Sequence, residues 1–222
     1  MPIDVKEIIR SKRKTLALIV KPDGSLIVRA PWRTPGRTIR EFVEKNAQWI
    51  ENKQQLALAA QPPDPKRYVP GELFMYLGTA YPLEIVSEQS VPLRLTENFK
   101  LVQSAQDNAE KVFERWYHGQ ARQVLHERVR LYANRHGLQY QGIRITSARG
   151  RWGSCSVQGS LNFSWRLILA PIEVVDYVAV HELVHTLFHN HSRQFWARVE
   201  TILPEYREHK KWLRTHGREC ML

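Results

Sequence analysis

Four histidines fall within one short stretch near the end of the chain, HELVHTLFHNHS, residues 181–192. The first two, His181 and His185, flank Glu182 in the spacing HExxH. Residues four apart lie on one face of an α-helix, so two imidazoles in this spacing can bind one metal ion. Glu182 lies about 100° further round the helix, where a carboxylate can take a proton from a water molecule that the metal activates. The pattern predicts a metal-dependent hydrolase with Glu182 as general base.

A metal site of this kind needs a third protein ligand, and two more histidines are near. His189 continues the four-residue series, but its Cα is expected about 12 Å along the helix from the first histidine of the motif. That distance puts it nearly out of reach of a shared ion. His191 follows a predicted helix end at Asn190, where a left-handed residue lets the chain turn back. Its spacing from His185 matches HExxHxxGxxH, with Phe188 in place of the glycine.

A carboxylate is the alternative third ligand. Glu205 directly follows Pro204 at the start of a predicted helix, and Glu200 and Glu208 are further choices. His191 is preferred, and Glu205 stays open. The bland alternative for the whole motif is a surface helix with two polar histidines. Its neighbours are apolar, VVDYVAVHELVHTLF, and buried His and Glu side chains need partners such as a metal. One Zn²⁺ ion is the expected cofactor, although another divalent transition metal can occupy such a site.

The elements that must position these residues follow from hydrophobic periodicity. Alternation of apolar and polar residues predicts strands at 14–30 (a hairpin around PDGS), 72–86 (a hairpin turning at Gly78), 91–102 and 142–170. Helical spacing predicts helices over 38–58, 109–136, 172–190, 193–203 and 205–217. Gly137 can end the second of these helices, and Ser192 can cap the start of the fourth.

This order of elements is α+β, because strands and helices are grouped rather than alternating in βαβ units. We expect two regions: residues 1–105, strand-rich with one helix, and residues 106–222, which carry the HExxH helix. The segment QPPDPKRYVPG, residues 61–71, is predicted to be a loop or linker.

Charge and cysteine content narrow the setting. The formal net charge is +11 and the pI about 9.9, which favours anionic partners such as nucleotides or nucleic acid; the alternative is a basic solvated surface. Two cysteines without a CxxC pair favour a reducing compartment. The N-terminus has no apolar signal region, and no apolar run is long enough to cross a membrane. We therefore expect a cytoplasmic protein with no membrane partner.

The C-terminal sequence from Arg149 to Gly217 contains the motifs WGSCS, LNFSWRL, DYVxxHELxH and NHSxxFW. With these motifs it resembles the bacterial YgjP-like metallopeptidase family of predicted metal-dependent hydrolases. Two earlier stretches resemble the leading domain of the same family: RSKRKTLALIVKPDGSLIVRAP and the segment from Tyr68 to Leu83. These proteins are zincins, related in motif to SprT-like and WLM metalloproteases. The resemblance implies a zincin-like fold for residues 106–222. It also implies that Glu182 is the catalytic base and that the metal ligands are His181, His185 and His191.

In zincins an edge strand above the metal pairs with an extended substrate. RWGSCS or LNFSWRL can be that strand, and Gly153 would let another backbone approach closely. Cys155 is expected to be a small packing residue rather than a nucleophile or ligand. The candidate substrate-binding residues, each with packing or solvent exposure as the alternative, are Arg151, Trp152, Gly153, Asn162, Arg166 and Tyr206.

Three functions remain in order of preference. The first is a zinc-dependent hydrolase that cleaves peptides. The second is a metal-dependent nucleoside triphosphate pyrophosphohydrolase, favoured by the positive charge and by the arginines before the HExxH helix. The third is a DNA-associated SprT-like protease, favoured by the basic runs RSKRK and HKKWLR. The expected partners are therefore a peptide or nucleotide substrate, with nucleic acid as a further candidate.

Overall fold

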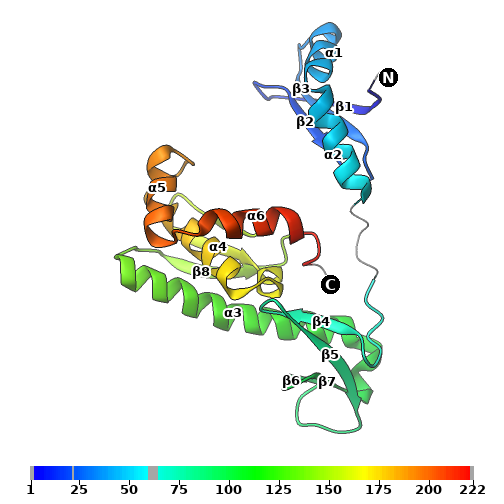
Figure 1. The fold of residues 1–222 in the computed structure, drawn as a ribbon, viewed down its shortest axis with the longest axis vertical. Coiled ribbons are helices and arrows are strands. Elements are labelled where there is room, and N and C mark those ends of the chain that lie inside the picture. The colour runs from blue at the N-terminus through cyan, green and yellow to red at the C-terminus, as the bar shows by residue number, and fades with distance from the viewer. Residues whose placement is uncertain (1–2, 22, 60–64, 221–222) are drawn as a thin grey trace. The chain divides into compact units, whose positions relative to one another are not determined.

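The structure, a computed structural model, describes residues 3–21, 23–59 and 65–220 (Figure 1). Its contacts divide the chain into Met1–Pro63 and Asp64–Leu222. The boundary expected after residue 105 thus moves into the proline-rich segment predicted as a linker, of which residues 60–64 lie outside the description. Aromatic packing explains the difference. The ring of Phe74 stacks on that of Phe113, with centroids 4.2 Å apart, so the strands after residue 64 share a core with the long helix.

The N-terminal unit is a three-stranded sheet with helices. β3 (Leu26–Pro31) lies in the middle, antiparallel to β2 (Ala17–Val20) and parallel to β1 (Val5–Ser11). The predicted hairpin of β2 and β3 is confirmed, and β1 is an addition to it. In place of one helix over 38–58 there are two, α1 (Gly36–Lys45) and α2 (Ala47–Ala59). Asn46 separates them: its side-chain amide donates to the Phe42 carbonyl at 2.7 Å, an orphan acceptor at the end of α1.

The second unit begins with a four-stranded sheet in the order β4-β5-β7-β6. Its strands are β4 (Leu73–Tyr76), β5 (Thr79–Val86), β6 (Leu93–Leu95) and β7 (Phe99–Val102). The predicted turn at Gly78 is confirmed, with φ of 82°. A 3-10 turn, η1 (Gln103–Asn108), leads into α3 (Ala109–His136), which has the predicted bounds and ends at Gly137 with φ of 65°.

A second, three-stranded sheet follows α3, in the order β8-β10-β9. β8 (Gly142–Thr146) and β10 (Ser160–Ser164) are parallel, while β9 (Gly153–Cys155) pairs antiparallel with β10 and forms one edge. The chain then makes a 3-10 turn, η2 (Trp165–Leu169). Three helices complete the unit: α4 (Ile172–Val184), α5 (Arg193–Ile202) and α6 (Tyr206–His216). The architecture is α+β, as predicted.

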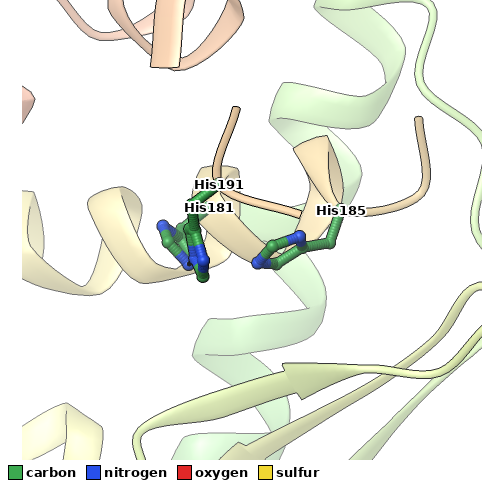
Figure 2. A group of neighbouring side chains, drawn as sticks. All are labelled: His181, His185 and His191. Atoms are coloured by element: carbon green, nitrogen blue, oxygen red, sulfur yellow. Dashed lines mark hydrogen bonds between the residues drawn. The ribbon is translucent and has the colours of Figure 1, made fainter. Parts of the chain in front are cut away.

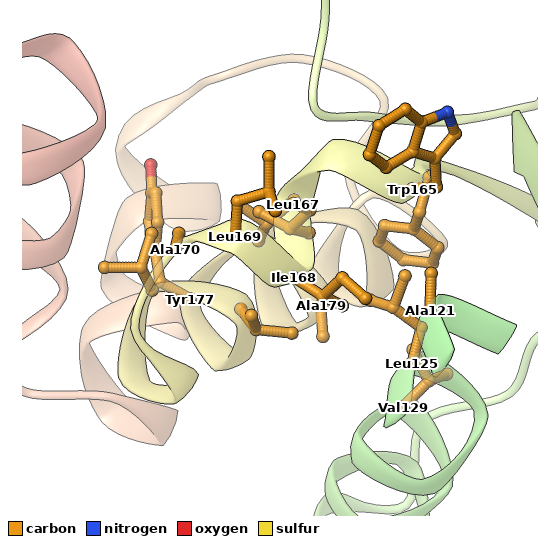
Figure 3. Close-up of a cluster of buried hydrophobic side chains, with 14 of the residues drawn as sticks. Ala121, Leu125, Val129, Trp165, Leu167, Ile168, Leu169, Ala170, Tyr177 and Ala179 are labelled. Carbon is orange, nitrogen blue, oxygen red and sulfur yellow. The ribbon is translucent and has the colours of Figure 1, made fainter. Parts of the chain in front are cut away.

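α4 is the helix that carries HExxH, and it is buried against α3 and η2. Figure 3 shows side chains of these three elements in one apolar cluster, including Leu125, Ile168 and Ala179. A polar contact also joins the helices: the Asp176 carboxylate, in a residue only 6% exposed, accepts hydrogen bonds from Arg128 and Tyr132 of α3. The orientation of α4 is therefore fixed both by packing and by a partly buried ion pair. Within the described ranges, no helix has the length and apolar character needed to cross a membrane.

Candidate metal centre

Three imidazoles meet at the end of α4. His181 lies in its last turn, His185 at its C-cap, and His191 in the loop before α5. Each ring offers one nitrogen, and these nitrogens lie within 4.8 Å of one another (Figure 2). Nε2 of His181 and Nε2 of His191 are 3.0 Å apart. The structure thus brings together the three histidines that the resemblance implies as ligands.

The chain reaches this arrangement by a sharper turn than the sequence indicated. The helix expected to run to residue 190 ends at Val184. The hydroxyl of Thr186 bonds the Leu183 carbonyl at 2.8 Å, and the ring of His185 bonds the Phe188 carbonyl at 2.9 Å through Nδ1. Local bonds of this kind compete with helix continuation.

The loop after α4 is closed by side chains rather than by a left-handed residue. Asn190 is not among the residues with positive φ, so its expected left-handed conformation is wrong. Instead its side-chain oxygen accepts from the backbone N–H of Ser192 at 3.1 Å. Ser192 in turn accepts from the Phe195 N–H at 3.3 Å and caps α5, as predicted. This pair of turns brings His191 back over α4.

The other candidate ligands lie outside the cluster. His189 is exposed in the loop between α4 and α5. Glu205 occupies the N-cap of α6, and its carboxylate is not in the group of ligand atoms, nor are those of Glu200 and Glu208. In the described part of the chain, the group of side chains that could hold a metal ion around the HExxH pair consists of these three histidines.

Burial and neighbouring charges keep two of the rings neutral. Burial first, then the neighbouring rings of His185 and His191 and the ammonium of Lys210, together lower the pKa of His181 to about 3. Burial, then His185 and Lys210, also lower the pKa of His191. Neutral imidazoles present lone pairs, which is the state a metal ion requires. Nδ1 of His181 is buried without a hydrogen-bond partner in the described part of the chain, so Nε2 is the nitrogen that faces the other rings.

Glu182 lies beneath strand β9. It is 6% exposed, and this burial raises its pKa to about 7. A Cβ built on Gly153 would stand 2.6 Å from Cγ and 2.6 Å from Oε1 of Glu182. The close approach that Gly153 was expected to permit is thus made by a carboxylate of the same chain. Cys155 lies two residues further along β9. Burial first, then the Glu182 carboxylate, raises the pKa of its thiol. A thiol that stays protonated is a poor nucleophile, which agrees with a packing role.

Aromatic rings surround the imidazoles on the α5 and α6 side. His191 stacks on Trp196, with centroids 5.6 Å apart, and Trp196 stacks on Tyr206 at 5.3 Å. Tyr206 is 6% exposed, and its hydroxyl accepts from Arg207 Nε at 3.3 Å, so packing is its evident role. The ammonium of Lys210 lies 3.9 Å from the centre of the Trp196 ring.

Sequence reasoning missed Trp196 and Lys210 as neighbours of the site. A usable signal existed for Trp196: it lies five positions after His191 in the first turns of a helix whose cap was predicted. Lys210 reaches the site from a separate helix, and only the packing of α6 against α4 brings it there.

The remaining candidate substrate residues are dispersed. Asn162 lies on β10 opposite Ser154, and its amide donates to that hydroxyl at 3.4 Å, on the face of the sheet away from Glu182. Arg166 is only 4% exposed; it bonds the Ser147 carbonyl at 3.1 Å and lies over the ring of Trp165, so it is a structural residue. Arg151 and Trp152 lie just before β9 and line the same hollow as Asn162.

An α+β unit in which three imidazoles converge beside a buried carboxylate defines a class of metal-binding hydrolase. The model of the "YgjP-like, metallopeptidase domain" matches residues 14–216. The chain therefore belongs to the YgjP-like family, which confirms the resemblance and indicates a metal-dependent hydrolase of the peptidase type. Searches of curated proteins and of solved structures found no match.

Proposed function

We propose that this protein is a zinc-dependent peptidase with a zincin-like site, in which His181, His185 and His191 hold one ion and Glu182 is the general base. The convergence of the three ring nitrogens within 4.8 Å is the observation that carries this proposal. The match to a family described as a metallopeptidase domain supports peptide-bond hydrolysis as the reaction.

The donor set fits zinc. Two nitrogens each about 2.0–2.1 Å from one zinc ion lie about 3.3 Å apart at a tetrahedral angle, and the separation between His181 and His191 is 3.0 Å. A carbonyl can only accept, so the bond from His185 to Phe188 requires the proton on Nδ1. That tautomer leaves the Nε2 lone pair free for the ion, and such a second bond is typical of metal-binding histidines.

The chain's own residues then have distinct tasks. A bound zinc ion supplies a Lewis acid that lowers the pKa of a water molecule and polarises the substrate carbonyl. Glu182 accepts the proton of the attacking water and delivers it to the leaving amine. In the metal-free chain, burial raises the pKa of the Glu182 carboxyl to about 7, and a general base works best when its pKa lies near the working pH. The wall of Phe195 and Trp196 excludes water from one side of the imidazoles.

The test measures metal and turnover together. Purified protein loaded with zinc is expected to hold one ion per chain and to cleave unstructured peptides. Glu182→Gln is expected to keep the ion and lose turnover, because the amide cannot take a proton. Cleavage by Glu182→Gln at the wild-type rate would refute the role of Glu182.

A parallel panel of nucleoside triphosphates, with detection of phosphate and pyrophosphate, separates the peptidase from a pyrophosphohydrolase. Triphosphate turnover that depends on Glu182, without any peptide cleavage, would replace the peptidase with the second candidate.

A further inference from the structure

The sheet that carries β9 has two different faces. Residues directly opposite each other on neighbouring strands point to the same face. Gly153 pairs with Phe163 on the face towards Glu182. The other face carries the row Ser154, Asn162 and Arg144, which crosses the sheet from β9 through β10 to β8. Polar residues thus replace the apolar ones on the side away from the imidazoles.

That outer face is hollowed. A cavity of about 420 Å³ lies over it and includes Arg144, Arg151, Ser154 and Asn162 in its lining. No carboxylate is among the described residues that line it. Neither arginine has a carboxylate within ion-pair distance in the described part of the chain. The hollow is therefore positively charged and supplies hydrogen-bond donors, so it is suited to a carboxylate.

The free edge of β9 borders both faces. The Trp152 carbonyl accepts from Ser164 N–H, and Ser156 N–H donates to the Ser160 carbonyl, each at 2.9 Å. Backbone groups alternate in direction along a strand, so the N–H and C=O groups of Gly153 and Cys155 point away from β10. In the described part of the chain β9 pairs on that one side only. An extended peptide can add there as a further strand.

Alternation within such a peptide links the edge to the hollow. Its residues opposite Gly153 and Cys155 share the face of Glu182, so the reacting bond would lie on that side. The residue between them is opposite Ser154 and points to the outer face, towards Arg151 and, across the sheet, Arg144.

Resting on the proposed peptidase function, we propose that the outer hollow is a specificity site. It receives an acidic side chain, Glu or Asp, of an extended peptide bound along β9, beside the bond to be cleaved.

The experiment compares matched peptides that differ at one position, bearing Glu, the isosteric Gln, or Lys. Zinc-loaded wild-type protein is expected to cleave the Glu peptide with a kcat/KM about tenfold above that of the Gln peptide, as one charge-assisted contact allows. Arg144→Glu/Arg151→Glu is expected to abolish this preference and favour the Lys peptide. Arg130→Glu/Arg135→Glu, on the exposed surface of α3, changes the net charge equally and is expected to keep the wild-type order.

Binding to the zinc-loaded Glu182→Gln protein, measured by fluorescence anisotropy, separates the two proposals. Arginine-dependent preference for the Glu peptide without cleavage by the wild type would support the hollow and refute the peptidase function. Cleavage with equal affinity for Glu and Gln peptides would refute the hollow and keep the function. Binding of a single-stranded oligonucleotide that is lost in Arg144→Glu/Arg151→Glu, with no charge preference among peptides, would overturn the acidic-peptide proposal in favour of nucleic acid.

Discussion

The carboxylate of Glu182 and the backbone of Gly153 are in such close contact that no other residue type fits at position 153 without displacing the carboxylate. The contact joins the middle of the HExxH motif to the edge strand β9. It places the proposed base directly under the backbone that we propose holds the substrate.

Gly153→Ala is expected to lower kcat/KM by about 100-fold, the effect of a base displaced by about 1 Å. The imidazoles are untouched, so zinc content is expected to stay at the wild-type level. Gly150→Ala is the matched control, because a Cβ at residue 150 meets nothing within 4 Å. Steady-state kinetics and metal analysis of both variants check the prediction, and an active Gly153→Ala protein would contradict it.

His191→Ala is expected to weaken zinc binding by at least about 10-fold, as the loss of one of three protein ligands requires. His189→Ala changes a histidine of the same loop that is exposed and outside the cluster, so its zinc affinity is expected to equal that of the wild type. Competition with a chromogenic chelator gives both affinities. The reverse order of zinc affinities would make His189 the third ligand. Unchanged zinc affinity in both variants would favour Glu205 as the third ligand.

The pKa of Glu182 predicts a pH effect on the metal-free protein. Folding raises this pKa from 4.5 to about 7, so the folded state binds the proton more tightly than the unfolded state. The resulting stability is present below pH 4.5 and is lost as the pH rises through 7. Glu182→Gln lacks this pH-dependent contribution to stability. With chelator present, the Tm of the variant minus that of the wild type is expected to rise from about pH 4 to about pH 8. A difference that does not change with pH would contradict the prediction.

The Arg128–Asp176 ion pair is expected to matter for the site through stability. Arg128→Ala leaves the buried Asp176 carboxylate with only Tyr132 as a partner, which is expected to cost about 3 kcal/mol of unfolding free energy. Tyr132→Phe removes one neutral donor and is expected to cost about 1 kcal/mol. Urea unfolding of both variants gives the two values, and equal losses would show that the ion pair has no special weight.

Much of this site was predictable because it depends on local spacing. Residues four apart share a helix face in any helix, so His181 and His185 had to be neighbours once the helix was recognised. The convergence of His191 was expected too, but by a different route. The helix ends early because Thr186 and His185 bond nearby carbonyls, and hydrophobic periodicity does not report such competition.

Other features depended on contacts between distant segments. Nothing in the pattern of β1 indicates that it pairs parallel with β3. The strands after residue 64 join the second unit through contacts between distant residues, such as the packing of Phe74 on Phe113. The side of the sheet on which Asn162 lies could have been inferred. Leu161 and Phe163 are the apolar neighbours in SLNFS, so period-two alternation already put the amide on the opposite face.

Only five residues separate His185 from His191, so an ion held by both rings would also affect the loop between them. An ion held by both rings would act as a cross-link that closes this small loop, and closing a loop removes conformational freedom from the chain. Metal binding would therefore change the backbone dynamics of this loop. Amide hydrogen exchange at residues 186–190 is expected to slow when the ion binds and to recover when a chelator removes it.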